Sequence, residues 1–387
     1  MNPIKSSEWA SSRTLAEADR VDASRTQSPH RLPPRLTVVI VNYNGWSDVL
    51  ALLGKLVEEP EIRSGVCRVV VVDNGSSEPA PNSRALRQPG VDLVLRPDNG
   101  GFAVGVNAGW RKSRGDWLLL LNPDVDVEPG TLGRIIARIG ALETRPDGSP
   151  GVVGFGLRNL DGTPQGSIGR FPSFARFVGE QFRPRRRRKY VAPRSVRPGP
   201  VDWATGACML LNARMMAEVG GMDEDFFLYH EEVALCRVAR DRGWAVEYDP
   251  GVQVVHRHPL QDRPISPKMR VVIRHGKLLY FLKHAPRRQF LALARVIEAE
   301  AALKGAWAAL LRRPAERRAW RTIGRMAAAM RRDRGPRGRE ALALAEDVEN
   351  EPSSSPLPPG EGGPKGRARG ARFRKRMSES KAASKLL

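Results

Sequence analysis

The sequence has few cysteines and no long hydrophobic run. Its three cysteines, Cys67, Cys208 and Cys236, are odd in number and lack the paired spacing of a structural metal site. A disulfide framework is therefore not expected, and a reducing, cytoplasmic compartment is the default expectation. No apolar stretch approaches the roughly 20 residues that a membrane span requires. The polar N-terminus also lacks the hydrophobic segment of a signal peptide.

Acidic side chains are too few to balance the basic ones. The 387 residues include 64 Lys and Arg against 42 Asp and Glu, which gives a formal net charge of +22. Such a charge attracts polyanions, a class that includes nucleic acid, anionic lipid and phosphorylated substrates. The basic runs, such as 183–189, are not interleaved with aromatic residues. A specific nucleic-acid partner is therefore not expected.

Composition and periodicity divide the chain into four regions. Residues 1–35 and 335–387 are rich in Pro, Gly, Ser and charge, and we expect both to be disordered tails, the second one basic. Residues 36–267 alternate apolar strands such as "RLTVVIVNYNG" with helical patterns. This alternation predicts an α/β fold in which helices flank a mainly parallel central sheet. Residues 268–334 are predicted to form a basic helical extension.

Polar side chains follow four of the predicted strands, at the point where each strand ends. These clusters lie at 42–44, 73–76, 98–101 and 122–126. Ligands of an open parallel sheet bind beyond the carboxyl ends of its strands, so the four clusters together predict a binding site. One such cluster alone would be explained equally well by a turn or a helix cap.

The cluster in "LLLLNPDVDVEPG" at 118–130 carries hard oxygen donors. Asn122 and Asp124 are two residues apart, so on an extended segment their side chains face the same way. An amide oxygen and a carboxylate suit Mg²⁺ or Mn²⁺ carrying a diphosphate, and the alternative is a plain Asn-Pro-Asp turn. His256 follows the apolar "VQVV". It either joins the same site or serves a structural role on its strand.

Two further segments offer chemistry, each beside a structural alternative. Glu231 and Glu232 follow the apolar "DFFLYH" and begin a predicted helix. Their carboxylates either supply a general base or stabilise the helix N-terminus. The segment "DNGGFAVGVNAGW" lacks both the dinucleotide and the Walker patterns. Its Gly100 and Gly101 either let backbone amides approach a phosphate or form an ordinary strand-to-helix turn.

Taken in order along the chain, these segments resemble glycosyltransferase family 2, in particular its bacterial rhamnosyltransferase-like branch. The resemblance covers about residues 36–285, and it is carried by "TVVIVNYNG", "VVVVDNGSSE", "DNGGFAVGVNAG", "LLLLNPDVDVEPG", "MDEDFFLYHEEVALCRVARDRGW" and "VQVVHRHP". It implies a GT-A nucleotide-diphospho-sugar transferase fold over 36–267. The nucleotide-sugar-binding half would be 36–130 and the acceptor-binding half 131–267. A divalent cation, Mg²⁺ or Mn²⁺, and inversion at the anomeric centre are also implied.

The resemblance further implies roles for individual residues. Asp124 and His256 would bind the metal. Glu232 would act as the catalytic base, with Glu231 orienting it or replacing it. The residues that would bind the nucleotide-sugar are Asn42, Asp73, Asn99, Gly100, Gly101, Asn107 and Asn122.

The chain departs from the family pattern at three positions. Asn122 replaces an acid, Glu232 replaces the usual Asp, and Ala234 stands where many relatives carry another acid. The longer Glu232 side chain moves the carboxylate of the expected base outward. These departures leave a second interpretation open, in which the chain is a non-catalytic nucleotide-sugar-binding protein.

The resemblance predicts a metal-dependent, inverting glycosyltransferase of the hexosyltransferase type. Its donor would be a dTDP- or UDP-linked sugar, with rhamnose as one candidate. Its acceptor would be a cell-surface polysaccharide or a lipid-linked glycan. The basic helices after 268 predict a peripheral position at the inner face of the cell membrane. The alternative for these helices is a solvated cap on the catalytic domain.

Overall fold

The computed structural model describes residues 34–181, 190–191, 197–259, 264–332 and 335–350. All of them fall within the second of two units, 33–387. Most of the predicted tails at 1–35 and 335–387, and the basic run at 183–189, lie outside the described residues.

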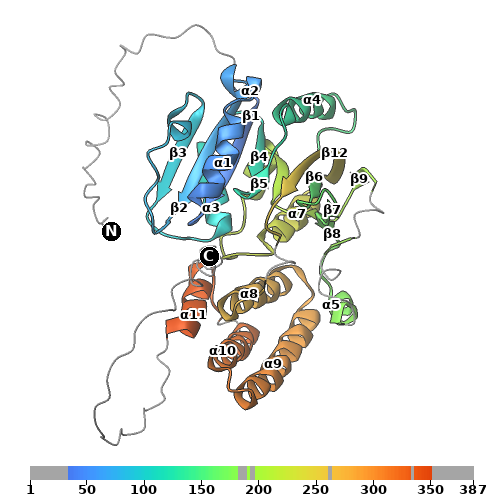
Figure 1. Cartoon of the computed structure of the whole chain (residues 1–387). Coiled ribbons are helices and arrows are strands. Elements are labelled where there is room, and N and C mark those ends of the chain that lie inside the picture. Colours follow the sequence, from blue (N-terminus) through green and yellow to red (C-terminus); the bar gives the residue numbers. More distant parts are fainter. Residues whose placement is uncertain (1–33, 182–189, 192–196, 260–263, 333–334, 351–387) are drawn as a thin grey trace, which may run out of the picture. The chain divides into compact units, whose positions relative to one another are not determined.

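Four parallel strands form the N-terminal half of the central sheet (Figure 1). They are β1 (Leu36–Asn42), β2 (Cys67–Asn74), β3 (Val91–Arg96) and β4 (Trp117–Leu121), in the order β3-β2-β1-β4. Val38 of β1 packs on the side of helix α1 (Trp46–Leu56), whereas Val39 packs on the side of helix α3 (Phe102–Lys112). Because helices cover both faces, these strands are apolar throughout instead of alternating.

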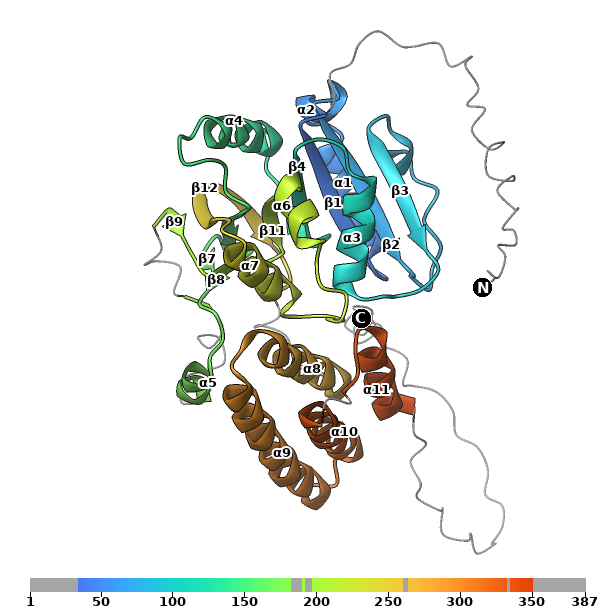
Figure 2. The same ribbon diagram turned by 180° about the vertical axis from the view of Figure 1, so that it is seen from behind.

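The other half of the sheet mixes strand directions. Its strands are β11 (Cys208–Asn212), β6 (Val152–Arg158), β12 (Val246–His256) and β5 (Val125–Asp126), which continue the order from β4. β11 is antiparallel to β4 and to β6, β12 is parallel to β6, and β5 is antiparallel to β12. Helices α3, α6 (Ala213–Val219) and α7 (Glu231–Asp241) cover one face (Figure 2). Helices α1 and α4 (Thr131–Glu143) cover the other.

Short elements complete the α/β part. They are α2 (Pro60–Arg63), a 3₁₀ turn (Ala85–Arg87), β7 (Pro164–Gln165), β8 (Ile168–Gly169), α5 (Phe174–Gln181), β9 (Gly199–Pro200) and β10 (Trp203–Ala204). β7 pairs with β6, β9 with β12, and β8 with β10. The predicted α/β class, with a mainly parallel sheet flanked by helices, is confirmed. The two-residue strand β5 was not predicted.

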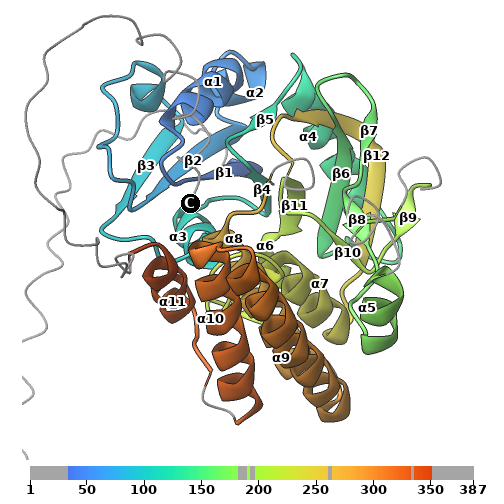
Figure 3. The same ribbon diagram turned by 60° about the horizontal axis from the view of Figure 1, so that its bottom comes forward.

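A helical extension follows the sheet, as predicted. Its helices are α8 (Pro267–His284), α9 (Arg287–Leu310), α10 (Pro314–Arg331) and α11 (Arg339–Asn350). α9 and α10 form a helical hairpin (Figure 3), and α8 packs against both of them. Within the described ranges, no helix combines the length and the apolar character needed to cross a bilayer.

Helix α11 corrects one prediction. We expected residues 335–387 to be disordered, but Arg339–Asn350 are helical. Ala341, Leu342, Ala345 and Val348 recur at helical spacing and are buried, and α11 packs on α8 and α10. The Pro- and Gly-rich composition of the surrounding residues concealed this short amphipathic pattern.

The helical extension contacts the carboxyl edge of the sheet. Arg339, at the start of α11, forms an ion pair with Asp98, which follows β3. Gly276 of α8 lies so close to the Tyr229 carbonyl that an added Cβ would be 2.3 Å from that oxygen. Asp98 and Tyr229 belong to the two segments that flank the predicted site, so the extension supports that site from one side.

Candidate active site

Polar side chains bind one another at the ends of β1 and β2, where the nucleotide was predicted to lie. Asn42 is fully buried, and its Nδ2 donates to Asp73 Oδ1 at 2.8 Å. Asn42 Oδ1 accepts the Gly45 backbone N–H at 3.0 Å. The Ser76 hydroxyl donates to Asp73 Oδ1 at 2.5 Å. The structure therefore brings Asn42 and Asp73 together at one point of the sheet edge.

A second amide network holds the predicted phosphate loop. Asn99 Oδ1 accepts the Gly101 backbone N–H at 3.0 Å and Asn74 Nδ2 at 3.0 Å. Gly101 has a φ of 97°, and an added Cβ would lie 2.5 Å from the Phe227 carbonyl oxygen. Only glycine fits such a conformation and such a contact. The loop is therefore fixed against the segment that leads to Glu231.

The structure brings Asp124 and His256 together. β5 pairs with the end of β12, with Val125 opposite His256. This register places His256 Nε2 3.4 Å from Asp124 Oδ1, and both side chains are largely buried. Asn122 directly follows β4, and its buried Oδ1 has no hydrogen-bond partner among the residues that the structure describes.

The hydrogen bonds of Gln165 determine which nitrogen of His256 carries the proton. Gln165 Nε2 donates to Asn159 Oδ1 at 2.8 Å and to the His256 carbonyl at 3.3 Å. Gln165 Oε1 therefore faces His256 Nδ1, at 2.7 Å, and Nδ1 must be the donor. In the neutral ring, Nε2 then keeps its lone pair and directs it towards Asp124. This arrangement is typical of a histidine that binds a metal.

The corner formed by Asn122, Asp124 and His256 fits a divalent cation. A carboxylate oxygen and an imidazole nitrogen, both acceptors, lie 3.4 Å apart, a separation compatible with ligand bonds of about 2.1 Å to one ion. Asn122 Oδ1 supplies a further oxygen whose hydrogen bonding is not satisfied within the described ranges. No group of three His, Cys, Asp or Glu side chains gathers there or elsewhere in these ranges. Donor oxygens and water would therefore have to complete the coordination.

A strained turn leads into the pair of acids. Glu231 and Glu232 begin α7 and are only 4% and 5% exposed. The two residues before them, Tyr229 and His230, have φ angles of 69° and 74°. Positive φ at a residue other than glycine costs about 1–3 kcal/mol, and such strain is concentrated at functional sites. The contact of Gly276 with the Tyr229 carbonyl holds this turn in place.

Comparison with known proteins shows which family this chain resembles. The model of "Glycosyl transferase family 2" matches residues 37–194. This range includes Asp124 and the predicted nucleotide-binding residues Asn42 and Asp73. This part of the chain is therefore similar to a family 2 glycosyltransferase domain. The N-acetylglucosaminyl-diphospho-decaprenol L-rhamnosyltransferase of Mycobacterium tuberculosis is 29% identical over 271 residues, 64% of this chain and 83% of that protein. This similarity agrees with the predicted resemblance to the rhamnosyltransferase-like branch.

Further relatives are more distant. The low-salt glycan biosynthesis hexosyltransferase Agl10 of Haloferax volcanii is 27% identical over 242 residues, 59% of this chain and 68% of that protein. Among solved structures, the mannosyltransferase PcManGT from Pyrobaculum calidifontis has a TM-score of 0.44 and 17% identity, over 86% of this chain and 92% of that chain. A likeness at this level is remote.

Sequence reasoning missed several residues of the candidate site. Arg96 ends β3, and its Nε donates to Asn74 Oδ1 at 3.1 Å, which places a cation beside the phosphate loop. Its position at a strand end was a signal that could have been used. Gln165 has no such signal, because it lies 91 residues before His256 and meets it only through the sheet. The strained Tyr229–His230 turn was equally invisible in the sequence.

Asn107, a predicted nucleotide-sugar ligand, and Asp126, in the polar cluster at 122–126, are bound away from the metal corner. The Asn107 side chain donates to the Met222 carbonyl and to Glu224 Oε1, both at 2.8 Å, and accepts the Met222 N–H at 2.8 Å. Its amide is therefore committed to the loop before α7. Asp126, two residues after Asp124, forms an ion pair with Lys55 of α1.

The cysteines take no part in this chemistry. Cys67, Cys208 and Cys236 are free and buried. Burial raises the pKa of the Cys208 thiol and that of the Cys236 thiol to about 12. Both stay protonated near neutral pH, so neither is a thiolate nucleophile or a ready metal ligand.

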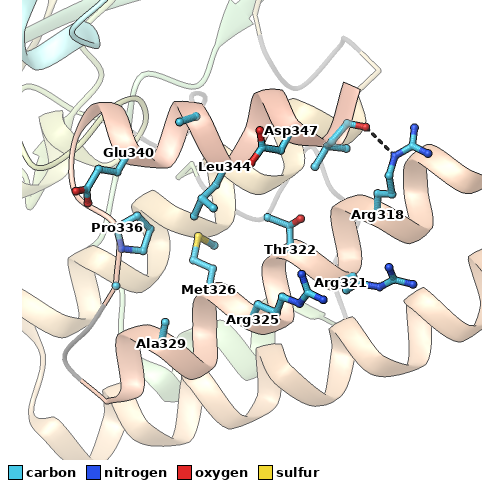
Figure 4. A pocket seen from close by; sticks show the side chains of 13 residues that line it. Arg318, Arg321, Thr322, Arg325, Met326, Ala329, Pro336, Glu340, Leu344 and Asp347 are labelled. Carbon is cyan, nitrogen blue, oxygen red and sulfur yellow. Dashed lines mark hydrogen bonds between the residues drawn. The ribbon is translucent and has the colours of Figure 1, made fainter. Parts of the chain in front are cut away.

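A cavity of about 620 Å³ lies elsewhere, between α10 and α11 (Figure 4). Arg318, Arg321 and Arg325 line it together with apolar side chains such as Met326 and Leu344. None of the predicted site residues lines this cavity. The candidate active site is therefore defined by the strand ends and not by this hollow.

Proposed function

We propose that this protein is an inverting glycosyltransferase. It moves a sugar from a nucleoside-diphosphate donor to a cell-surface polysaccharide or a lipid-linked acceptor. The observation that carries the proposal is the meeting of Asp124 and His256, 3.4 Å apart, beside an unsatisfied Asn122 oxygen. Asn122 and Asp124 of this cluster follow β4 within residues 37–194, the range that the family 2 model matches. A donor diphosphate is the ligand expected at such a strand end.

The donor would extend along the sheet edge from β2 to β5. Asn42 and Asp73 bind the nucleoside, and their mutual hydrogen bond of 2.8 Å holds the two groups ready for it. Asn99, Gly100 and Gly101 face the phosphates from the start of α3. Arg96 adds a positive charge beside this loop, which favours a diphosphate.

Asp124 and His256 would hold a divalent cation, Mg²⁺ or Mn²⁺. When bound, such a cation neutralises negative charge on the departing nucleoside diphosphate. Asn122 contributes its amide oxygen to the donor or to the ion. Gln165 keeps His256 Nδ1 protonated, so that Nε2 remains available as a ligand.

Glu232 acts as the catalytic base, and Glu231 orients it or replaces it. The base takes the proton of an acceptor hydroxyl as the hydroxyl oxygen attacks the anomeric carbon. The bond from that carbon to the diphosphate breaks on the opposite face, so the configuration inverts. The Tyr229–His230 turn determines where α7 begins and therefore where both carboxylates lie.

The acceptor and the location follow from charge and from relatives. The name of the M. tuberculosis relative describes a rhamnosyl transfer to a diphospho-decaprenol acceptor. A lipid-linked acceptor and a dTDP- or UDP-linked donor, with rhamnose as a candidate sugar, are therefore our proposal here. The net charge of +22 suits a peripheral position at the inner, anionic face of the cell membrane.

A panel of nucleotide-sugars, assayed with Mg²⁺ or Mn²⁺, tests this function. The wild type should release nucleotide from one donor, and Asp124→Ala should lower that rate about a hundredfold or more. Asp126→Ala is the matched control, since Asp126 pairs with Lys55 instead, and it should retain activity. If the protein binds a donor but shows no turnover with any acceptor, the transferase proposal is wrong and the protein is a non-catalytic nucleotide-sugar-binding protein. Equal rates for Asp124→Ala and wild type would remove the proposed metal site.

A further inference from the structure

Exposed apolar side chains concentrate at the end of α9. Among the described residues, eight large hydrophobic side chains are exposed, and five of them lie between 296 and 311. Leu303, Trp307 and Leu310 are 74%, 61% and 72% exposed, and they share one side of the helix at spacings of four and three. Trp307 is the one aromatic residue in that exposed set. Scattered surface leucines need no explanation, but a contiguous patch of this kind marks an interaction surface.

The sequence around these residues strengthens the pattern. The segment "AALKGAWAALL" at 301–311 contains one charge, Lys304, and its alanines at 302, 306 and 309 are also exposed. The next ten residues, "RRPAERRAWR" at 312–321, are rich in arginine. Between 303 and 321 there are six cationic side chains and one acid. An apolar ridge with a tryptophan is thus bordered by a cationic collar. We call 303–311 the apolar tip and 312–321 the collar.

The apolar tip rests on a rigid base. Trp320 of α10 is 4% exposed, and the cationic groups of Arg270 and Lys304 lie 5.2 Å and 4.8 Å from its ring centre. Arg274 of α8 forms two hydrogen bonds of 2.7 Å with Glu300 of α9. These contacts tie the hairpin of α9 and α10 to α8 (Figure 3). The exposed ridge is therefore a fixed feature of the hairpin.

We propose that the apolar tip inserts into the interface of an anionic lipid bilayer while the collar binds the headgroups. A tryptophan among leucines suits the boundary between headgroups and acyl chains. Arginine forms strong, often bidentate hydrogen bonds with phosphate. A second copy of this chain fits the surface less well, because a symmetric contact would bring two collars of the same charge together.

This insertion would give the proposed transferase access to membrane-anchored acceptors, and that role rests on the proposed function. The helical extension reaches the carboxyl edge of the sheet through the Arg339–Asp98 ion pair and through Gly276. A bilayer held by the apolar tip would approach the enzyme through the same extension that supports the Tyr229–His230 turn. The tip would thus select acceptors that are anchored in the membrane.

Co-sedimentation of the full chain with vesicles tests the insertion. Vesicles of phosphatidylcholine with about one third phosphatidylglycerol should bind the wild type, and pure phosphatidylcholine vesicles should bind it weakly. The triple variant Leu303→Ser, Trp307→Ser, Leu310→Ser should lower the partition coefficient about tenfold or more. Leu160→Ser is the matched control, because Leu160 is 72% exposed but lies between β6 and β7. It should bind as the wild type does.

A second measurement keeps the test independent of folding and of catalysis. Brominated lipid should quench wild-type fluorescence more than that of Trp307→Phe, which retains the other tryptophans. Vesicle binding by the triple variant at the wild-type level would overturn the insertion and assign binding to other basic residues. Self-association of the wild type, abolished in the triple variant and without vesicle binding, would overturn it in favour of a second copy. Donor turnover in solution does not depend on the tip, so a failure here leaves the transferase proposal standing.

Discussion

The carboxyl edge of the sheet and the tip of the α9–α10 hairpin break the usual burial rule in opposite directions. At the sheet edge, polar groups are buried: Asn42 is 0% exposed, Asp124 7% and Glu232 5%. At the tip, apolar groups are exposed, with Leu303 at 74%. Buried polar groups and exposed apolar patches are the two informative exceptions among surface and core residues. Each of them identifies where this molecule meets something else.

The two exceptions have different physical costs. Burying a polar group is unfavourable unless it is hydrogen-bonded, and the Asn42–Asp73 and Asn99–Gly101 networks meet that requirement within the protein. The unsatisfied Asn122 Oδ1 does not meet it. An exposed leucine lacks the favourable free energy of burial that a leucine in the core gains. At the proposed metal corner and at the tip alike, our proposals make the missing partner a ligand.

Glu232→Gln should have the largest effect on sugar transfer. It tests whether the buried carboxylate at the sheet edge is the catalytic base. The amide cannot accept the acceptor proton, so transfer should fall about 10²–10⁴-fold. Donor affinity, measured by calorimetry with the nucleotide-sugar and Mn²⁺, should stay within about threefold because the base does not bind the donor.

Glu231→Gln serves as the comparison for this variant. If Glu231 only orients its neighbour, its loss should reduce transfer less than the loss of Glu232 does. Full transfer by Glu232→Gln together with inactive Glu231→Gln would assign the base to Glu231.

Gly276→Val should have the next largest effect on turnover, because Gly276 is where α8 of the helical extension contacts the turn beside the candidate site. A Cβ at this position would lie 2.3 Å from the Tyr229 carbonyl oxygen, so the strained turn before Glu231 must shift. A displacement of about 1 Å at a reacting group can lower turnover about a hundredfold. We expect kcat to fall while vesicle binding stays at the wild-type level.

Gly54→Ala is the matched control for a glycine within a helix. An added Cβ there meets nothing within 4 Å, so this variant should be active and more stable by about 0.5–1 kcal/mol. Unchanged kcat in Gly276→Val would show that α8 does not support the turn.

Much of the sheet could be predicted from the sequence, because its physical signals are local. Continuous apolar runs such as β1 and β4 require helices on both faces, and the polar residues that follow them mark the strand ends. The extension was predicted as helical, but α11 was missed because its four buried residues lie in Pro- and Gly-rich surroundings.

The site was only partly predictable, because its second half depends on pairings that are distant in sequence. Strand β5 has two residues and exists only because it pairs with β12. Gln165 reaches His256 through the same half of the sheet. The left-handed conformation of Tyr229 and His230 contradicts the local preference of both residues. The tip was foreseen only as basic helices, since exposure cannot be deduced from "AALKGAWAALL" alone.

Gln165→Leu should have a smaller effect, confined to the metal corner. Leucine removes the acceptor for His256 Nδ1, which lies 2.7 Å from Gln165 Oε1, so the ring loses its fixed tautomer. Loss of such a supporting hydrogen bond lowers metal affinity about 10–100-fold. Mn²⁺ binding measured by electron paramagnetic resonance checks this, with Gln165→Glu expected to restore affinity. Wild-type affinity in Gln165→Leu would show that His256 does not need this support.

The smallest expected effect is a loss of folding stability at mildly acidic pH. It arises in the helical extension and should leave the sheet edge unchanged. His275 of α8 is fully buried, and its Nε2 lies 2.9 Å from the Pro336 carbonyl oxygen. Burial lowers the pKa of His275 below its usual value of 6.5, and Arg337 lowers it further, against the opposing effects of the Pro336 hydrogen bond and of Asp225 and Glu340. Below pH 6.5 the unfolded chain therefore takes up this proton before the folded one does. Stability is complete above that pH and declines as the pH falls towards the lower folded value.

His275→Gln tests this linkage. Glutamine does not titrate and can still donate to the Pro336 carbonyl, so denaturant unfolding at pH 7.5 and 5.5 should show a smaller loss for the variant than for the wild type. The pKa of His284 is also lowered by burial, so both proteins should lose some stability, and the difference between them reports His275. Equal losses would mean that the folded protein accommodates a charged His275. Because α8 joins the hairpin to the Tyr229–His230 turn, vesicle binding and turnover should weaken together as this helix loosens. The sheet-edge networks at Asn42 and Asn99, which contain no histidine, should be unaffected.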